Sequence, residues 1–141
     1  YLVTNGTLSV QKGRLKSANI SRYFEDIFIS EELGYNKPSI EYFDCCFSKI
    51  PDFHKETAVI IGDSLTSDIQ GGLNAEIRTI WFNPNHSKAD KIIPDYEFDS
   101  LPKLPQLLSE IRELRTAERI TIRLRLTVQS KRTLTIRHRQ Q

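Results

Sequence analysis

The sequence contains no methionine and only two cysteines among its 141 residues. Cys45 and Cys46 are neighbours, a placement that rarely allows a disulfide between them, and no second cysteine pair is present to complete a zinc site. We interpret both as small apolar residues of a helix in a reducing compartment, which predicts a cytoplasmic protein. A reactive thiol is the alternative. Because no initiating methionine is present, we also expect the chain to be a piece of a longer protein.

Long apolar stretches are missing as well. No run approaches the roughly 18 residues that a membrane-spanning helix needs. Hydrophobic residues make up 38% of the chain and charged residues 27%, which is typical of a water-soluble globular domain. A length of 141 residues suits one such domain.

Charge divides the chain into two regions. Residues 1–114 contain 12 Lys+Arg and 17 Asp+Glu, whereas residues 115–141 contain 8 and 1. In the second region apolar residues alternate with polar ones, so we predict a basic low-complexity tail that is either disordered or a β-hairpin. Its cations suit nucleic-acid phosphates, but it has no aromatic residue to stack on a base, so nucleic acid is the less favoured partner.

Short apolar runs alternate with longer amphipathic ones over residues 1–114. Strands are predicted at residues 2–4, 26–30, 57–61 and 77–82, and helices at residues 7–20, 39–50, 66–75 and 104–114. The uninterrupted apolar run at 57–61 is typical of a strand covered on both faces. The helix at 39–50 is predicted to bury one apolar stripe formed by Ile40, Phe43, Phe47 and Ile50. This alternation predicts an α/β fold with a mostly parallel sheet.

Polar residues follow three of these segments, and ligands gather at the carboxyl ends of parallel strands. Carboxylates beside a helix start suit Mg²⁺, whereas hydroxyls, backbone amides and a lysine suit phosphate oxygens. Together such groups stabilise a phosphoryl group during its transfer. The candidate residues are Thr4, Asn5 and Gly6 after the first strand, Lys37 after the second, and Asp63 and Asp68 after the third.

Each candidate also has an ordinary structural interpretation. Thr4 alone is a strand-end residue, and Lys37 alone is a solvated surface lysine. Asp63 is then a helix cap, and Asp68 is an acid favoured by the helix dipole in a first turn. The order and spacing of the four, rather than any one of them, favour the functional interpretation.

These segments resemble motifs of the haloacid dehalogenase-like (HAD) phosphohydrolase superfamily. Its second motif resembles Leu2-Val3-Thr4-Asn5-Gly6, its third resembles the lysine in Gly34-Tyr35-Asn36-Lys37-Pro38, and its fourth resembles Gly62-Asp63-Ser64-Leu65-Thr66-Ser67-Asp68. Residues 29–34 and 67–75 are most similar to the pyrimidine 5′-nucleotidase branch. The resemblance covers about residues 1–112, and the fourth motif is its most specific part.

The resemblance implies a Rossmann-like parallel sheet flanked by helices, the core domain of this family, at residues 1–114. It also implies a Mg²⁺-dependent phosphatase that hydrolyses small phosphomonoesters, nucleoside 5′-monophosphates in particular, through an aspartyl-phosphate intermediate. On this basis Asp63 is expected to ligate Mg²⁺ and Asp68 to complete or orient the metal site.

The resemblance implies phosphate-binding roles for the remaining candidates. Thr4 is expected to hydrogen-bond the phosphoryl group, with Asn5 and Gly6 beside it in the substrate site. Lys37 is expected to neutralise the charge of the phosphorylated intermediate.

The first motif of this family, Asp-x-Asp, does not occur before Thr4, and the cap domain that sets substrate choice is also absent. The resemblance implies that the first-motif strand lies between the strand ending at Thr4 and the one ending at Ile61. We therefore expect the chain to be truncated at its N-terminus and inactive by itself. We also expect it to fold poorly, to self-associate through unpaired strand edges, or to pair those two strands directly.

Two other functions stay open. A catalytically inactive phosphate- or protein-binding module is favoured by the missing first motif. A receiver-like signalling domain also combines clustered acids with a lysine, but its acidic pair would precede its other motifs, whereas Asp63 follows Lys37.

Overall fold

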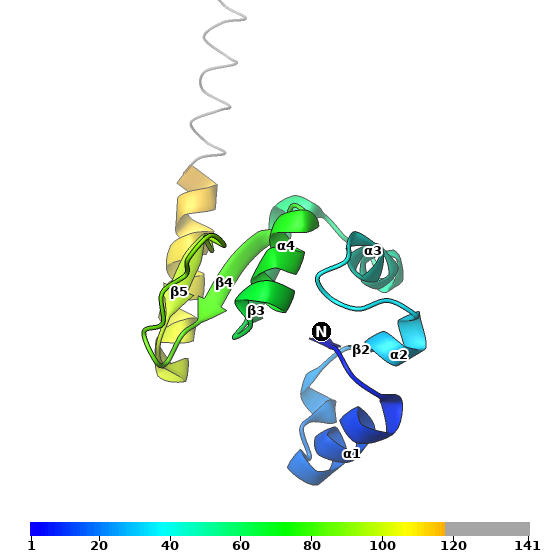
Figure 1. Ribbon diagram of the computed structural model, residues 1–141. Coiled ribbons are helices and arrows are strands. Elements are labelled where there is room, and N and C mark those ends of the chain that lie inside the picture. Colours follow the sequence, from blue (N-terminus) through cyan, green and yellow to red (C-terminus); the bar gives the residue numbers. More distant parts are fainter. Residues whose placement is uncertain (118–141) are drawn as a thin grey trace, which may run out of the picture. The chain divides into compact units, whose positions relative to one another are not determined.

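The structure is a computed structural model that describes residues 1–117 (Figure 1). It contains two compact units, Tyr1–Ser100 and a second one that begins at Leu101. The second unit starts with the helical turn Leu101–Lys103, and residues 104–117 are helical, which confirms the helix predicted at 104–114. None of the helices described is both long enough and apolar enough for a bilayer. The predicted basic tail lies, from residue 118 onward, outside the described residues.

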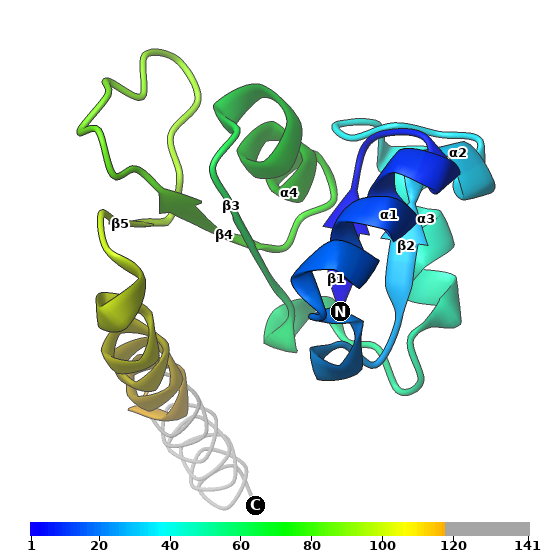
Figure 2. The same cartoon turned by 90° about the horizontal axis from the view of Figure 1, so that it is seen from below.

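The first sheet of the larger unit has two parallel strands. β1 (Leu2–Thr4) pairs with β2 (Ile27–Ile29), and Val3 lies opposite Phe28. The connection between them contains α1 (Leu8–Ala18) (Figure 2). Leu15 of this helix is buried. Both strands and the helix were predicted, and they form the compact β-helix-β unit that a parallel pair requires.

The second sheet has three parallel strands in sequence order. β3 (Val59–Gly62) pairs with β4 (Arg78–Phe82), and β4 pairs with β5 (Tyr96–Phe98). β5 was not predicted, because its three residues include Glu97 and form no apolar run. The α/β fold class with parallel strands flanked by helices is confirmed, but the described residues form two sheets instead of one.

The helix predicted at residues 66–75 is confirmed with a different geometry at its start. A π-helical turn, Leu65–Ile69, leads into α4 (Gln70–Asn74). α4 approaches the second sheet closely, since a Cβ added at Gly72 would lie only 2.4 Å from Ile60 of β3. A glycine at this position therefore lets the helix backbone pack directly on the strand.

A further helix packs against both sheets. After the short α2 (Ser30–Leu33), α3 (Ile40–Lys49) contributes Tyr42, Phe43 and Cys46 to a core that also contains Phe28 of β2 and Ile60 of β3. One helix thus supports one face of each sheet, and the apolar core runs continuously beneath both.

The predicted apolar stripe of this helix needs one correction. Ile40 is 45% exposed, whereas Tyr42 is fully buried. The helix is rotated because the Tyr42 hydroxyl bonds to both strands of the first sheet, accepting from the Thr4 amide at 3.0 Å and donating to the Phe28 carbonyl at 2.8 Å. A buried tyrosine needs such partners, whereas isoleucine does not.

The prediction that the strand at 57–61 is covered on both faces is wrong for the described residues. Ile60 of β3 is only 5% exposed, but its neighbours Val59 and Ile61 are each 38% exposed. Direct pairing of the first and third strands, one of the three outcomes expected, is not found among the described residues, because β1 pairs with β2 and β3 pairs with β4. β3 therefore packs on one face only.

Candidate active site

Lys37 connects two of the predicted site segments. Its Nζ lies 2.6 Å from Asp68 Oδ1 and donates to the Val3 carbonyl of β1 at 3.0 Å. The Lys37 and Asp68 side chains are 8% and 9% exposed. The interpretation of Lys37 as a solvated surface lysine is therefore wrong, and this lysine is a buried ammonium at the carboxyl end of β1.

The Asp68 carboxylate is held at the end of β3 by backbone contacts. Its Oδ2 accepts a hydrogen bond from the Ser64 amide at 3.1 Å. A Cβ added at Gly62 would lie 2.3 Å from the same oxygen, so the carboxylate lies directly against the glycine backbone. The glycine that ends β3 is thus needed to admit Asp68.

The Asn5 side chain fixes the loop that carries Lys37. Its Oδ1 accepts from the Lys37 amide at 2.9 Å, and its Nδ2 donates to the Lys37 carbonyl at 3.0 Å. The Asn5 side-chain amide thus pairs with the Lys37 backbone as a residue of a neighbouring strand would. The end of β1 and the lysine loop are therefore positioned together.

The neighbouring residues Thr4 and Gly6 are anchored through their backbones. The Thr4 amide donates to the Tyr42 hydroxyl, and the Gly6 amide donates to Ser30 Oγ at 2.9 Å. Gly6 has a φ of +139°, which favours glycine at the turn that leaves β1. The Thr4 hydroxyl makes a local bond of 3.3 Å to the Asn5 carbonyl.

Tyr42 and Ser30 were not identified from the sequence. Burial raises the pKa of the Tyr42 phenol above its ordinary range, so the hydroxyl stays protonated and keeps donating to the Phe28 carbonyl. The sequence offers little signal for this role, because the partners of the hydroxyl lie 38 and 14 residues away.

Asp63 is exposed at the end of β3. Its carbonyl accepts from Trp81 Nε1 at 3.0 Å, and Trp81 is buried. The interpretation of Asp63 as the helix cap is wrong, because Ser64 is the N-cap residue, whose side chain accepts from the Ser67 amide at 3.2 Å. Ser64, which follows Asp63, donates its backbone amide to Asp68, so the two aspartates belong to one loop.

The two aspartates are compatible with magnesium in kind and number. Within residues 1–117 no cluster of three or more His, Cys, Asp or Glu residues is arranged to hold a metal ion. Mg²⁺ does not require one, because it is commonly bound through one or two carboxylates together with waters and substrate phosphates. Asp63 and Asp68 would supply two carboxylates of this kind, and Asp68 also pairs with Lys37.

The contacts bring together most of the predicted site. Lys37 is bonded to Asn5, to Val3, which precedes Thr4, and to Asp68. The Lys37 ammonium therefore lies between the ends of β1 and β3 and is paired with the Asp68 carboxylate. Asp63 has an exposed carboxylate in the loop that holds Asp68.

The chain is similar in sequence to known proteins. The family described as haloacid dehalogenase-like hydrolase matches residues 1–82. YfnB of Bacillus subtilis, a HAD-hydrolase by name, is 44% identical over 77% of this chain and 47% of its own length. Pyrimidine 5′-nucleotidase PynA of Streptococcus pneumoniae is 43% identical over 72% of this chain and 44% of its own.

A solved structure agrees with the fold. The crystal structure of the YfnB protein from Bacillus subtilis, bound to magnesium, superposes with a TM-score of 0.74 at 45% identity. The match covers 77% of this chain and 48% of that one, so the chain spans about half the length of the curated relatives it matches. The chain belongs to the haloacid dehalogenase-like hydrolases.

Proposed function

We propose that this chain forms the phosphate- and magnesium-binding part of a phosphatase that hydrolyses small phosphomonoesters, with nucleoside 5′-monophosphates as its substrates. The observation that carries the proposal is the buried Lys37 ammonium between the end of β1 and Asp68. The substrate class is supported by the name of PynA, a pyrimidine 5′-nucleotidase. The two free cysteines, Cys45 and Cys46, support a cytoplasmic location.

In this proposal the chain's own residues bind and orient the phosphoryl group. Thr4 donates its hydroxyl to a phosphoryl oxygen, which replaces the long local bond to the Asn5 carbonyl. Lys37 supplies positive charge to the same group, and the Asn5 amide keeps the lysine loop in place. Gly6 presents its backbone beside the substrate.

Asp63 and Asp68 are the residues that would hold Mg²⁺. The ion, when bound, would supply positive charge beside the phosphoryl oxygens. Asp63 is exposed and therefore accessible to it, whereas Asp68 is oriented by Lys37 and the Ser64 amide.

The reaction proposed for the whole enzyme passes through an aspartyl-phosphate. No Asp-x-Asp sequence precedes Thr4 in this chain. We therefore propose that the attacking aspartate is supplied by another segment, and that the chain by itself releases no phosphate from uridine 5′-monophosphate. Turnover by the purified chain would contradict this part of the proposal.

Binding of Mg²⁺ in the presence of inorganic phosphate tests the site without turnover. Isothermal titration should give an affinity that falls by roughly tenfold or more in Asp63→Asn, because a charged oxygen ligand is lost. Asp44→Asn is the matched control, since it removes the same charge from an exposed position of α3. Equal affinities in the two variants would remove Asp63 from the metal role.

A further inference from the structure

The chain contains a single tryptophan, Trp81, whose side chain is bonded to the loop that carries the two aspartates. Trp81 lies in β4 and is only 4% exposed. Its indole Nε1 donates to the Asp63 carbonyl at 3.0 Å. An indole has one N–H donor and no acceptor, and a buried tryptophan needs a partner for that donor. In this chain the partner is the backbone of Asp63.

The strand register places the Trp81 side chain on the same side of the sheet as Asp68. Gly62 of β3 lies opposite Trp81 of β4. Residues that lie opposite each other on neighbouring strands direct their side chains to one face of the sheet. On Gly62 that face is occupied by the Asp68 carboxylate, which lies where a Cβ would be. The indole of Trp81 and the carboxylate of Asp68 therefore share one face at neighbouring strand ends.

The backbone of Asp63 lies just beyond the strand ladder. β3 ends at Gly62, and its pairing with β4 ends there too. After this point the Asp63 carbonyl is bonded to the indole, and the Ser64 amide is bonded to Asp68. The Asp63 side chain itself is exposed. The indole thus connects the sheet to the backbone of Asp63 and leaves the carboxylate of Asp63 open to solvent.

Burial alone does not require an indole at this position. Phe82 of β4 and Phe98 of β5 pack together with ring centroids 5.0 Å apart, and neither side chain has a polar atom. A phenylalanine at position 81 would likewise bury an aromatic ring. It would lack the N–H that reaches Asp63, so the hydrogen bond is the property that distinguishes Trp81 from an ordinary core residue.

We propose that Trp81 is a positioning residue of the magnesium site, whose indole N–H fixes the Asp63 backbone and thereby restricts the directions that the Asp63 carboxylate can take. The inference rests on the proposed function, because it requires Asp63 to be a magnesium ligand. Hydrogen-bond partners behind metal ligands orient those ligands, and their loss typically lowers metal affinity by roughly 10–100-fold. Trp81 acts in this way from β4, outside the loop that holds both aspartates.

The indole N–H provides a spectroscopic test in the full chain. With one tryptophan, a proton–nitrogen correlation spectrum contains one indole signal. Its proton should exchange slowly with solvent before any metal is added, because the indole is buried and bonded. Addition of Mg²⁺ and inorganic phosphate should shift this signal. The shift should be lost in Asp63→Asn and retained in Asp44→Asn.

Two replacements of Trp81 separate the N–H from the ring. The amino acid 3-benzothienylalanine has the same fused rings with sulfur in place of N–H, so it keeps the packing and loses the bond to Asp63. Isothermal titration of Mg²⁺ with inorganic phosphate should give an affinity roughly tenfold lower than in the parent chain. The matched control is 5-fluorotryptophan, which retains the N–H and should bind Mg²⁺ like the parent chain. Thermal melts should show that both forms are folded at the titration temperature.

The possible failures point to different conclusions. An indole proton that exchanges as fast as in the unfolded chain would show that the bond to Asp63 is absent. An unchanged affinity in the benzothienyl form, together with a loss in Asp63→Asn, would overturn the inference and leave the proposed function in place. Equal losses in the benzothienyl and fluorotryptophan forms would assign the effect to ring packing instead of the N–H. If Asp63→Asn binds Mg²⁺ as well as Asp44→Asn does, the proposed function fails and the inference fails with it.

Discussion

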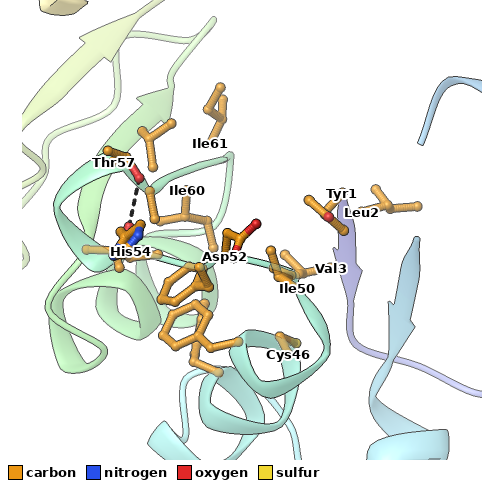
Figure 3. A pocket seen from close by; sticks show the side chains of 16 residues that line it. Tyr1, Leu2, Val3, Cys46, Ile50, Asp52, His54, Thr57, Ile60 and Ile61 are labelled. Atoms are coloured by element: carbon orange, nitrogen blue, oxygen red, sulfur yellow. Dashed lines mark hydrogen bonds between the residues drawn. The ribbon is translucent and has the colours of Figure 1, made fainter. Parts of the chain in front are cut away.

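The carboxyl ends of β1 and β3 differ in chemistry from the edges of the same two strands. At the carboxyl ends of β1 and β3, polar groups are paired with one another through Lys37, Asn5 and Asp68. The facing edges of the two strands border an apolar groove (Figure 3), in which Val59 and Ile61 are partly exposed, and neither facing edge pairs with a described strand. A buried charge without a partner is strongly destabilising. Exposed apolar side chains cost a smaller free energy, which is spread over many atoms.

The difference shows which part of the molecule depends most on its internal contacts. The polar end is held by hydrogen bonds that connect the loop after β1, the loop of Lys37 and the loop after β3. The groove is formed by two sheets that share the support of α3 but not a strand ladder. Stability changes should therefore be large at the polar end and small along the groove.

The largest effect is expected from Lys37→Met. Removal of the ammonium leaves the Asp68 carboxylate buried without its charged partner, and breaking such a pair costs about 3–5 kcal/mol. Urea denaturation should report this loss in the free energy of unfolding. Lys37→Met combined with Asp68→Asn should lose less than Lys37→Met alone, because the remaining buried group is then neutral.

An exposed ion pair supplies the control for Lys37. Lys55 and Glu76 are bonded at 3.0 Å, but both side chains are open to solvent. Lys55→Met should change the free energy of unfolding by less than about 1 kcal/mol. A loss from Lys37→Met no greater than that from Lys55→Met would contradict the contrast drawn between the two regions.

A smaller effect is expected from Tyr42→Phe. The variant keeps the ring in the core and removes the hydroxyl that bridges the Thr4 amide and the Phe28 carbonyl. Loss of the bridge should destabilise the chain by about 1–2 kcal/mol. Tyr23→Phe at a largely exposed position is the matched control, and equal losses in both variants would show that the bridge contributes nothing.

Alkaline pH should weaken the core beside this tyrosine. Burial raises the pKa of the Cys46 thiol from 9.0 to about 12. The unfolded chain therefore loses this proton first, so the stabilisation is complete below about pH 9 and is lost as pH rises toward 12. The expected slope is about 1.4 kcal/mol per pH unit. Denaturation at pH 8, 9 and 10 should show the slope between 9 and 10 in the parent chain and a shallower one in Cys46→Ala.

Much of the fold was predictable because its signals are local. The apolar stripe near residues 39–50 and the run ending at Gly62 gave the right element types within a few residues of α3 and β3. β5 was not predicted because Tyr96–Phe98 contains a charged residue at its centre, and its strand geometry is set by pairing with β4. The exposed face of β3 was not predicted either, because the burial of a strand depends on which other segments pack against it.

The candidate site was predictable in its residue types but not in its connections. The spacing of Thr4, Lys37 and Asp68 predicted that they serve one site, and the contacts of Lys37 join their segments. That Asn5 bonds to the lysine loop, and that Tyr42 bonds to the strand end, depends on tertiary packing. Hydrogen bonds between residues more than 30 positions apart have no local signature.

The smallest expected effect sharpens the contrast within β3 itself. Ile60→Val and Ile61→Val remove the same methylene from adjacent residues of one strand. Ile60 packs in the core, so its variant should lose about 0.5–1.5 kcal/mol, whereas the partly exposed Ile61 should lose less than about 0.5 kcal/mol. Urea titrations of the two variants measure the difference.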